Sequence, residues 1–362
     1  MHNKRNGFSL IELLIVMALI VVVLAMSSDT LTAILRQSSR ETKIAGTQIE
    51  GIIGLDFVRL DIEQAGYGLP WSFQSTAINY SEAAASLSAS TYNDSTANPP
   101  RAIISGNDVG FNGSDYLVIK STIVGIGDVT SKWSYIKTGQ NPRVWGSNDL
   151  INGDRVIVVK PNAGEKKSVE LVMSDGTFFT RYSSSSFPSD FSPKETSEMF
   201  LIYGVDTDTD LRMPFNRADY YIKIPTSNMP ASCAPGTGVL YKATVNQSGG
   251  GLHEMPILDC VADMQIVFGL DTSSSGSINT HSNDISTLTA EQIRTQLKEV
   301  RVYILIHEGP MDRYYTYSHQ VITIGEFGVG RDFDLLEKIG TGWQNYRWKI
   351  NTLVIKPKNL FS

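Results

Sequence analysis

The sequence lacks any long basic run and any catalytic signature, and its first 69 residues contain no proline. Lysine and arginine number 31 against 37 aspartates and glutamates, which gives a formal charge of −6 over 362 residues. Because no stretch gathers positive charge, we do not expect nucleic acid as a partner. Between Phe8 and Gly66 no proline occurs, so nothing in that span forces a helix to stop.

Motifs for catalysis are also missing. The sequence has no His-Glu-x-x-His, no Cys-x-x-Cys, no Gly-x-Ser-x-Gly and no phosphate-binding loop. The four histidines beyond the N-terminal segment are scattered: His253, His281, His307 and His319. Isolated histidines in strands are most often structural. We therefore do not expect an enzyme or a resident cofactor.

One long apolar run begins near the N-terminus. Phe8 to Met26 is interrupted only by Ser9 and Glu12. At about 1.5 Å per residue, roughly 20 such residues cross the core of a bilayer. Residues 27–30, Ser-Ser-Asp-Thr, make a poor signal-peptidase site, so the run is predicted to be retained. The polar residues 1–7 before it are predicted to be a removable leader.

Glu12 is the exceptional residue of this run. A carboxylate inside a membrane-spanning stretch costs about 2.5–3.5 kcal/mol on insertion scales and is a functional candidate. If the chain is cut between Gly7 and Phe8, the new amino group of Phe8 lies one helical turn from Glu12. In a packed bundle of helices, an amine and a carboxylate on neighbouring subunits would neutralise each other and fix the axial register.

The segment 7–14, Gly-Phe-Ser-Leu-Ile-Glu-Leu-Leu, resembles the cleavage and methylation motif shared by type IV pilins and type II secretion pseudopilins. The resemblance implies cleavage after Gly7 by a prepilin peptidase and N-methylation of Phe8. It also implies that Glu12 occupies the family's assembly position. Further partners would be other minor and major pilins and the inner-membrane assembly platform.

The charges of the leader predict the orientation of the chain. Lys4 and Arg5 precede the apolar run and would keep the N-terminus in the cytoplasm. We therefore expect a single-pass protein of the inner membrane, with its C-terminal domain in the periplasm and later in a pilus at the cell surface. The predicted divisions are a leader (1–7), a transmembrane helix (8–28), an extracytoplasmic half-helix (29–66) and a globular domain (67–362).

The second half of the helix has its own apolar pattern. Ile49, Ile53, Phe57 and Leu60 recur at helical spacing, and Ile52 joins them, which predicts an amphipathic helix with this stripe against the core. Residues 66–70, Gly-Tyr-Gly-Leu-Pro, predict the helix end. Three glycines lie within the helix and predict a curve or a place where it unwinds: Gly46, Gly51 and Gly54.

The remaining residues predict a β-rich body and hence an α+β fold, in which a long helix packs on a pilin-like domain with insertions. The clearest strands are 116–119, 155–159, 200–203, 264–268, 300–306 and 346–355. Alternation along 300–306 predicts one buried face. Thr289 and Gln292 predict a capping box that begins a short helix. Long Ser/Thr-rich loops are expected at 81–100, 183–192 and 272–288.

Parts of the body resemble the PilW family of minor pilins. Residues 59–68, Arg-Leu-Asp-Ile-Glu-Gln-Ala-Gly-Tyr-Gly, are similar to that family's helix end, and residues 258–271 are similar to a later segment. Residues 153–156 and 236–241 match more weakly. The resemblance implies a structural minor pilin that primes assembly or lies at the filament tip. A type II secretion pseudopilin and an adhesive tip module are the alternatives.

The two cysteines and two acidic loops are the other candidate sites. Cys233 and Cys260 are either core thiols or, if the body lies outside the cytoplasm, a disulfide. Two loops have part of the spacing of a calcium site. The first lacks the glycine at its sixth position, and the second has a serine in place of the bidentate acid. Both are expected to be solvated turns, with calcium as a weaker alternative; their acidic residues are Asp206, Asp208, Asp210 and Asp271.

Overall fold

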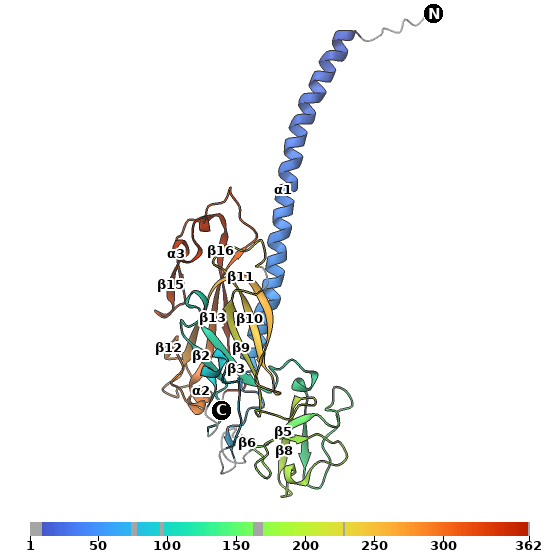
Figure 1. Cartoon of the computed structure of the whole chain (residues 1–362), viewed down its shortest axis with the longest axis vertical. Helices are drawn as coiled ribbons and strands as arrows, with labels where there is room; N and C mark the ends of the chain where they lie inside the picture. The colour runs from blue at the N-terminus through green and yellow to red at the C-terminus, as the bar shows by residue number, and fades with distance from the viewer. Residues whose placement is uncertain (1–8, 74–77, 95–97, 162–168, 227–228, 361–362) are drawn as a thin grey trace, which may run out of the picture. The chain divides into compact units, whose positions relative to one another are not determined.

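The computed structural model describes residues 9–360 except 74–77, 95–97, 162–168 and 227–228. Residues 1–49 and residues 50–362 form two compact units. Helix α1, Leu10–Glu63, supplies the first unit and continues into the second, where β-sheets follow it (Figure 1). The predicted α+β class, an N-terminal apolar helix followed by a β-rich domain, is confirmed.

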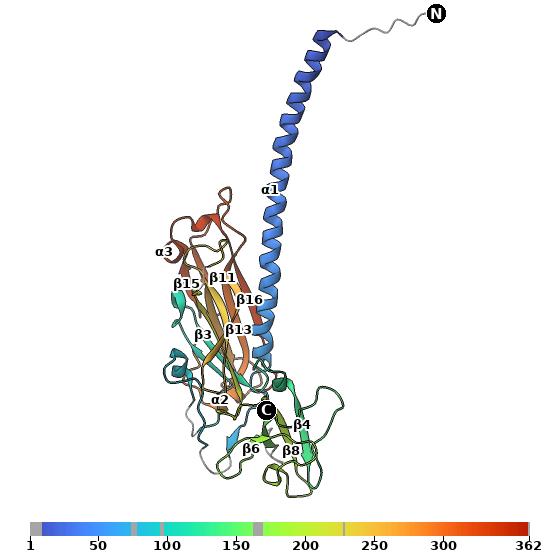
Figure 2. The ribbon, with the colours of Figure 1, turned by 45° about the vertical axis from the view of Figure 1, so that its right-hand side comes forward.

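The larger sheet of the second unit has eight strands in the order β16-β13-β11-β10-β9-β3-β2, with β12 paired to β11. All these pairings are antiparallel. Figures 1 and 2 show its central strands side by side. The bounds are β2 Ile103–Gly106, β3 Tyr116–Ser121, β9 Asn216–Lys223, β10 Gly238–Val245, β11 Leu252–Leu270, β12 Thr280–Ser282, β13 Leu297–Glu308 and β16 Arg347–Ile355.

A second sheet is inserted almost entirely between β3 and β9, two strands that pair directly with each other. It has six strands in the order β1-β6-β5-β8-β4, with β7 paired to β5. It has its own apolar core, which includes Val156, Val158 and Ile202. The bounds are β1 Ser72–Phe73, β4 Trp133–Lys137, β5 Arg155–Pro161, β6 Val169–Leu171, β7 Thr180–Arg181 and β8 Met199–Asp206.

Strand β13 is buried on both faces, whereas the alternation in its sequence predicted only one buried face. Val302 and Ile304 belong to the main core, which lies on the same side as α1. Tyr303 and Leu305 face a second core. That second core is closed by the hairpin β14 Val321–Ile324 and β15 Arg331–Asp334 and by helix α3, Leu335–Ile339. The large apolar residues of both strand faces are therefore explained by two covering layers.

Within the second unit, α1 packs on the sheet through a different face from the one predicted. Val58 and Ile62 are fully buried in the main core, and each such side chain contributes about 1.5–3 kcal/mol. The predicted stripe is wrong for its described side chains, since Ile52, Ile53 and Leu60 are more than half exposed. Phe57 is also exposed, at 40%.

Two glycines explain why the pattern of apolar residues did not predict the buried face of α1. Gly51 and Gly54 point to strand β11, and a Cβ on Gly54 would lie 2.0 Å from the carbonyl oxygen of Ile257. The helix backbone therefore approaches the strand closely at this point. Helix α1 continues through both residues and through Gly46, which has nothing within 4 Å of a Cβ.

The six predicted strands are all present, as β3, β5, β8, β11, β13 and β16. Helix α2, Ala290–Gln296, begins with the predicted capping box of Thr289 and Gln292. Strands β9 and β10 were not predicted, although they lie at the centre of the larger sheet. Every residue of β10 is buried, including Lys242 and Thr244, so no simple alternation marks it.

Candidate functional site

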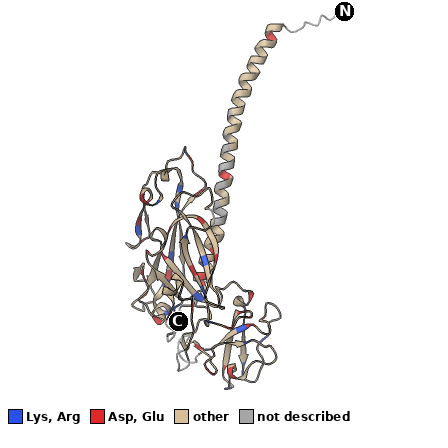
Figure 3. Cartoon of the chain, viewed as in Figure 1, with Lys and Arg blue, Asp and Glu red and all other residues tan. Residues whose placement is uncertain are grey.

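The first part of α1, Leu10–Thr32, is an apolar helix of 23 residues. In the described part of the chain it is the single helix that is long and apolar enough to cross a membrane, by length and composition. Its large apolar side chains are exposed within the chain, by between 51% at Ile20 and 82% at Leu10. Figure 3 shows how little charge this half of α1 carries. Such a helix fits a single-pass anchor.

Glu12 lies in the first turn of α1 and is exposed. One of its carboxylate oxygens accepts a hydrogen bond from the backbone N–H of Ser9 at 2.9 Å, and the Ser9 hydroxyl accepts from the N–H of Ile11 at 3.4 Å. This hydrogen bond is the one that the glutamate of a capping box makes to the N-cap residue. The Ser-x-x-Glu spacing was present in the sequence and was missed there. The predicted cleavage residues, Gly7 and Phe8, lie outside the described residues.

Buried polar contacts fasten α1 to the larger sheet. The carboxylate of Asp61 accepts a hydrogen bond from the Tyr220 hydroxyl at 2.6 Å and forms an ion pair with Lys242 at 2.5 Å. Burial raises the pKa of Asp61, and the adjacent Lys242 ammonium partly offsets this effect. A charged link in this position ties the helix to both β9 and β10.

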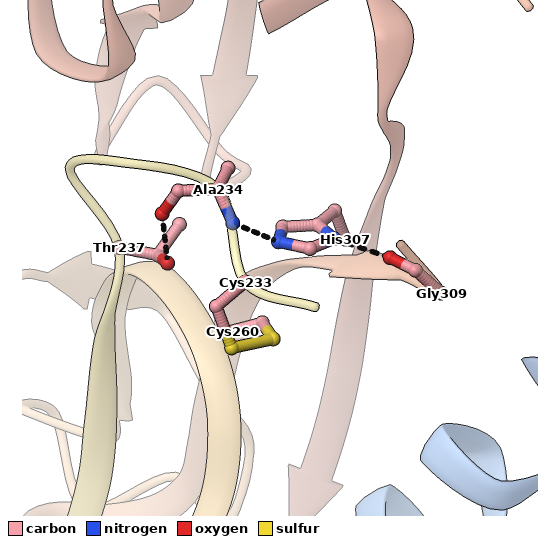
Figure 4. Close-up of a disulfide and its surroundings, with 6 residues drawn as sticks. All are labelled: Cys233, Ala234, Thr237, Cys260, His307 and Gly309. Atoms are coloured by element: carbon pink, nitrogen blue, oxygen red, sulfur yellow. Dashed lines mark hydrogen bonds between the residues drawn. A yellow bond between two sulfur atoms is a disulfide. The ribbon is translucent and has the colours of Figure 1, made fainter. Parts of the chain in front are cut away.

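A disulfide joins Cys233 and Cys260, and it links the segment before β10 to the middle of β11 (Figure 4). The disulfide expected for an extracytoplasmic body is therefore present. Cys260 has a φ of +57° where β11 changes register against β10. A left-handed residue at such a point is typical of a β-bulge. The bond closes a separation of 27 residues and would stabilise by about 3 kcal/mol in the chain-entropy model.

His307 of β13 supports the backbone beside this disulfide (Figure 4). Its Nε2 accepts from the N–H of Ala234 at 2.8 Å, and its Nδ1 lies 3.1 Å from the carbonyl oxygen of Gly309. Both contacts are satisfied together by a neutral ring that carries its proton on Nδ1. Burial lowers the pKa of His307 to about 4. The histidine is structural, as the sequence predicted for isolated histidines.

A cluster of buried charges holds the loop 81–94 against strands β3 and β9. Arg217, with no exposed surface, binds both Glu82 at 2.9 Å and Asp219 at 2.7 Å. Lys120, also fully buried, binds Glu82 at 2.7 Å and Asp94 at 2.6 Å. All these side chains are paired, so the cluster replaces hydration with fixed partners. The Ser/Thr-rich loop predicted here is thereby anchored at its acidic residues.

The acidic residues considered for calcium are mostly occupied by the chain itself. Asp206 accepts backbone N–H groups of residues 208 and 209, and Asp210 pairs with Arg155. The Asp271 carboxylate accepts the N–H groups of residues 275 and 276. Over the described ranges, no three His, Cys, Asp or Glu side chains gather in a way that could hold a metal ion.

Residues 2–28 match the prokaryotic N-terminal methylation motif. No curated protein and no solved structure matches the chain. The motif is type IV prepilin-like, and it implies processing by a prepilin peptidase and assembly with other pilins. Together with the exposed apolar helix and Glu12, it supports a pilin-like or pseudopilin protein with a structural role.

Proposed function

We propose that this chain is a minor pilin of a type IV pilus, most similar to the PilW family. In this account α1 holds the subunit in the inner membrane until it enters the filament. The observation that carries the proposal is the methylation motif at residues 2–28, with a carboxylate at Glu12 and no charge after it until Asp29. A helix of this kind stores a subunit in lipid and can later be buried against other helices.

The exposed apolar side chains of the second half of α1 support the same proposal. Ile52, Ile53 and Leu60 face away from the body that packs on the opposite side of the helix. Burying such a side chain against a neighbouring subunit would gain about 1.5–3 kcal/mol. Exposed contiguous apolar surface of this kind marks interaction sites. The stripe therefore extends the assembly surface beyond the membrane segment.

A deletion strain tests the proposal and separates it from a secretion pseudopilin. Surface pili are sheared from the cells and quantified, and the secreted proteins of the same cultures are measured. A minor pilin that primes assembly predicts a loss of pili with secretion unchanged, restored by the wild-type gene. Normal piliation with a loss of secreted protein would overturn the proposal in favour of the pseudopilin.

An adhesive tip module remains a second candidate because of an aromatic pair on the inserted sheet. Trp133, on the edge strand β4, and Trp145 are 38% and 44% exposed, with ring centroids 5.0 Å apart. The indole N–H of Trp145 donates to the carbonyl oxygen of Trp133 at 3.0 Å, which fixes the pair. Fixed, exposed aromatic rings are typical of binding surfaces. Replacing both with alanine should reduce adhesion without reducing piliation if the module is adhesive.

A further inference from the structure

We propose that the cleft beside helix α2 binds a carboxylate group through Arg294. The cleft has a volume of about 560 Å³ and lies among α2, the segment 286–289, residues 98–101 and Trp71. This volume is within the range of small-molecule sites. The inference concerns the body of the protein and does not depend on the pilin role proposed above.

Arg294 is the buried cation of this cleft. The residue is only 9% exposed, and its Nη1 atom is buried without a hydrogen-bond partner in the described part of the chain. Burial lowers the pKa of Arg294, while Glu291, one turn earlier, acts in the opposite sense without forming an ion pair. A buried guanidinium nitrogen without an acceptor is rare in folded proteins. An acceptor supplied by a ligand would explain it.

The other acid that lines the cleft, Asp94, already has partners. Asp94 lines the cleft, but its two oxygens bind Arg101 at 2.7 Å and Lys120 at 2.6 Å. Arg101 also donates to the carbonyl oxygen of Ser286 at 2.9 Å. Because Asp94 serves these two cations, it does not compensate Arg294.

The elements around Arg294 are fixed, as a binding site requires. The guanidinium carbon of Arg294 lies 4.8 Å from the ring centroid of Trp71, and the backbone N–H of Trp71 donates to the carbonyl oxygen of Val169 at 2.8 Å. Helix α2 is held at its start by its capping box and at its end by a hydrogen bond from the backbone N–H of Asp271 to the carbonyl oxygen of Gln296 at 2.7 Å.

The lining favours a singly charged carboxylate over a phosphate. A guanidinium can bind either group through two parallel hydrogen bonds. However, Glu291 also lines the cleft, and its charge opposes a dianion more than a monoanion. Leu288, Pro99 and Trp71 offer apolar surface for the rest of the ligand. The carboxylate could come from an acidic side chain of another protein or from a free organic acid.

The test uses full-length protein in detergent, with its five tryptophans labelled as 5-fluorotryptophan for ¹⁹F NMR. The resonance of Trp71 is assigned with Trp71→Phe. Two probes represent the two sources: the peptide acetyl-Gly-Glu-Gly-amide and the free acid propionate. Inorganic phosphate is titrated as the competing anion, and sodium chloride at matched ionic strength is the blank.

The proposal predicts a saturable shift of the Trp71 resonance with one or both carboxylates. Arg294→Gln should weaken this binding at least tenfold, Arg294→Lys should weaken it less, and the exposed-site control Arg181→Gln should leave it unchanged. The tighter probe identifies the source of the carboxylate. The four other resonances report whether each variant keeps its fold. If Arg294→Gln does not fold, the comparison of wild type with Arg294→Lys tests the proposal.

Three results would overturn the proposal. The first is that neither carboxylate shifts the Trp71 resonance. The second is that sodium chloride shifts it equally. The third is that both Arg294 variants bind the carboxylates as tightly as wild type does. A response to phosphate alone would overturn the carboxylate assignment.

Discussion

Gly54 of helix α1 lies directly against the carbonyl oxygen of Ile257 in strand β11, at a distance that leaves no room for a Cβ. Substitution with alanine would therefore force the helix away from the sheet. We expect Gly54→Ala to destabilise the protein by about 1–3 kcal/mol, the range for overpacking, despite alanine's higher helix propensity. Thermal unfolding of the full-length chain in detergent measures this.

Gly46→Ala is the matched control for that prediction. It introduces the same side chain into the same helix where nothing lies within 4 Å. It should leave the melting temperature unchanged or raise it. Equal melting temperatures for the two variants would contradict the close contact at Ile257.

The contacts of His307 predict a pH dependence of stability. Its pKa is about 4 in the folded protein against 6.5 for an unperturbed histidine. The stability that the neutral ring contributes to the folded protein is fully present above pH 6.5 and is lost as the pH falls towards 4. At about 1.4 kcal/mol per pKa unit, the loss reaches roughly 3 kcal/mol. Burial raises the pKa of Asp115 to about 7, which acts in the opposite sense, so variants must be compared.

His307→Gln provides the comparison, because glutamine can keep one donor and one acceptor without titrating in this range. Its free energy of unfolding should fall less than that of wild type between pH 6.5 and pH 4. His319→Gln, at an exposed site, should follow wild type. Parallel curves for wild type and His307→Gln would refute the assignment.

Removing the central cation of the buried cluster should be severe. Arg217→Met leaves Asp219 without its cation and leaves Glu82 with Lys120 alone, and breaking a buried pair in this way costs about 3–5 kcal/mol. Denaturant unfolding followed by circular dichroism measures the loss. Arg59→Met removes an exposed partner of Asp56 and should change stability by less than about 1 kcal/mol. Similar losses of stability in the two variants would show that burial does not determine how much an ion pair contributes.

Glu12→Leu tests the assembly carboxylate. The variant should insert into the membrane but enter sheared filaments less than wild type, because no carboxylate remains to pair with a neighbouring amino terminus. Asp56→Asn, which changes an exposed acid on the same helix, serves as the control. Filament incorporation is measured by immunoblot against membrane content. Unchanged incorporation of Glu12→Leu would remove the register role.

The fold was predictable where local pattern and burial agree. Strong β-branched runs marked strands β5 and β13, and the Thr289 to Gln292 spacing marked helix α2. The predicted strand at 116–119 stopped short of Lys120, because a charge normally ends an apolar run. The structure continues β3 through Lys120, which long-range partners at Glu82 and Asp94 keep fully buried.

The buried face of α1 was not predictable from apolar spacing. Periodicity detects large apolar residues, and here they lie on the exposed side of the helix, while Gly51 and Gly54 make the closest approach to the sheet. Arg294 was equally hidden, since no sequence pattern shows that a charged side chain lacks a partner after folding. The N-terminal motif needed no tertiary information, because its parts are adjacent in the chain.

The most direct test of the account is the N-terminus of the protein in sheared surface filaments. Tandem mass spectrometry of its N-terminal peptide should identify N-methylated Phe8 as the first residue, with residues 1–7 absent. An N-terminus at Met1, a cut after the apolar helix, or absence of the protein from purified filaments would contradict a minor pilin.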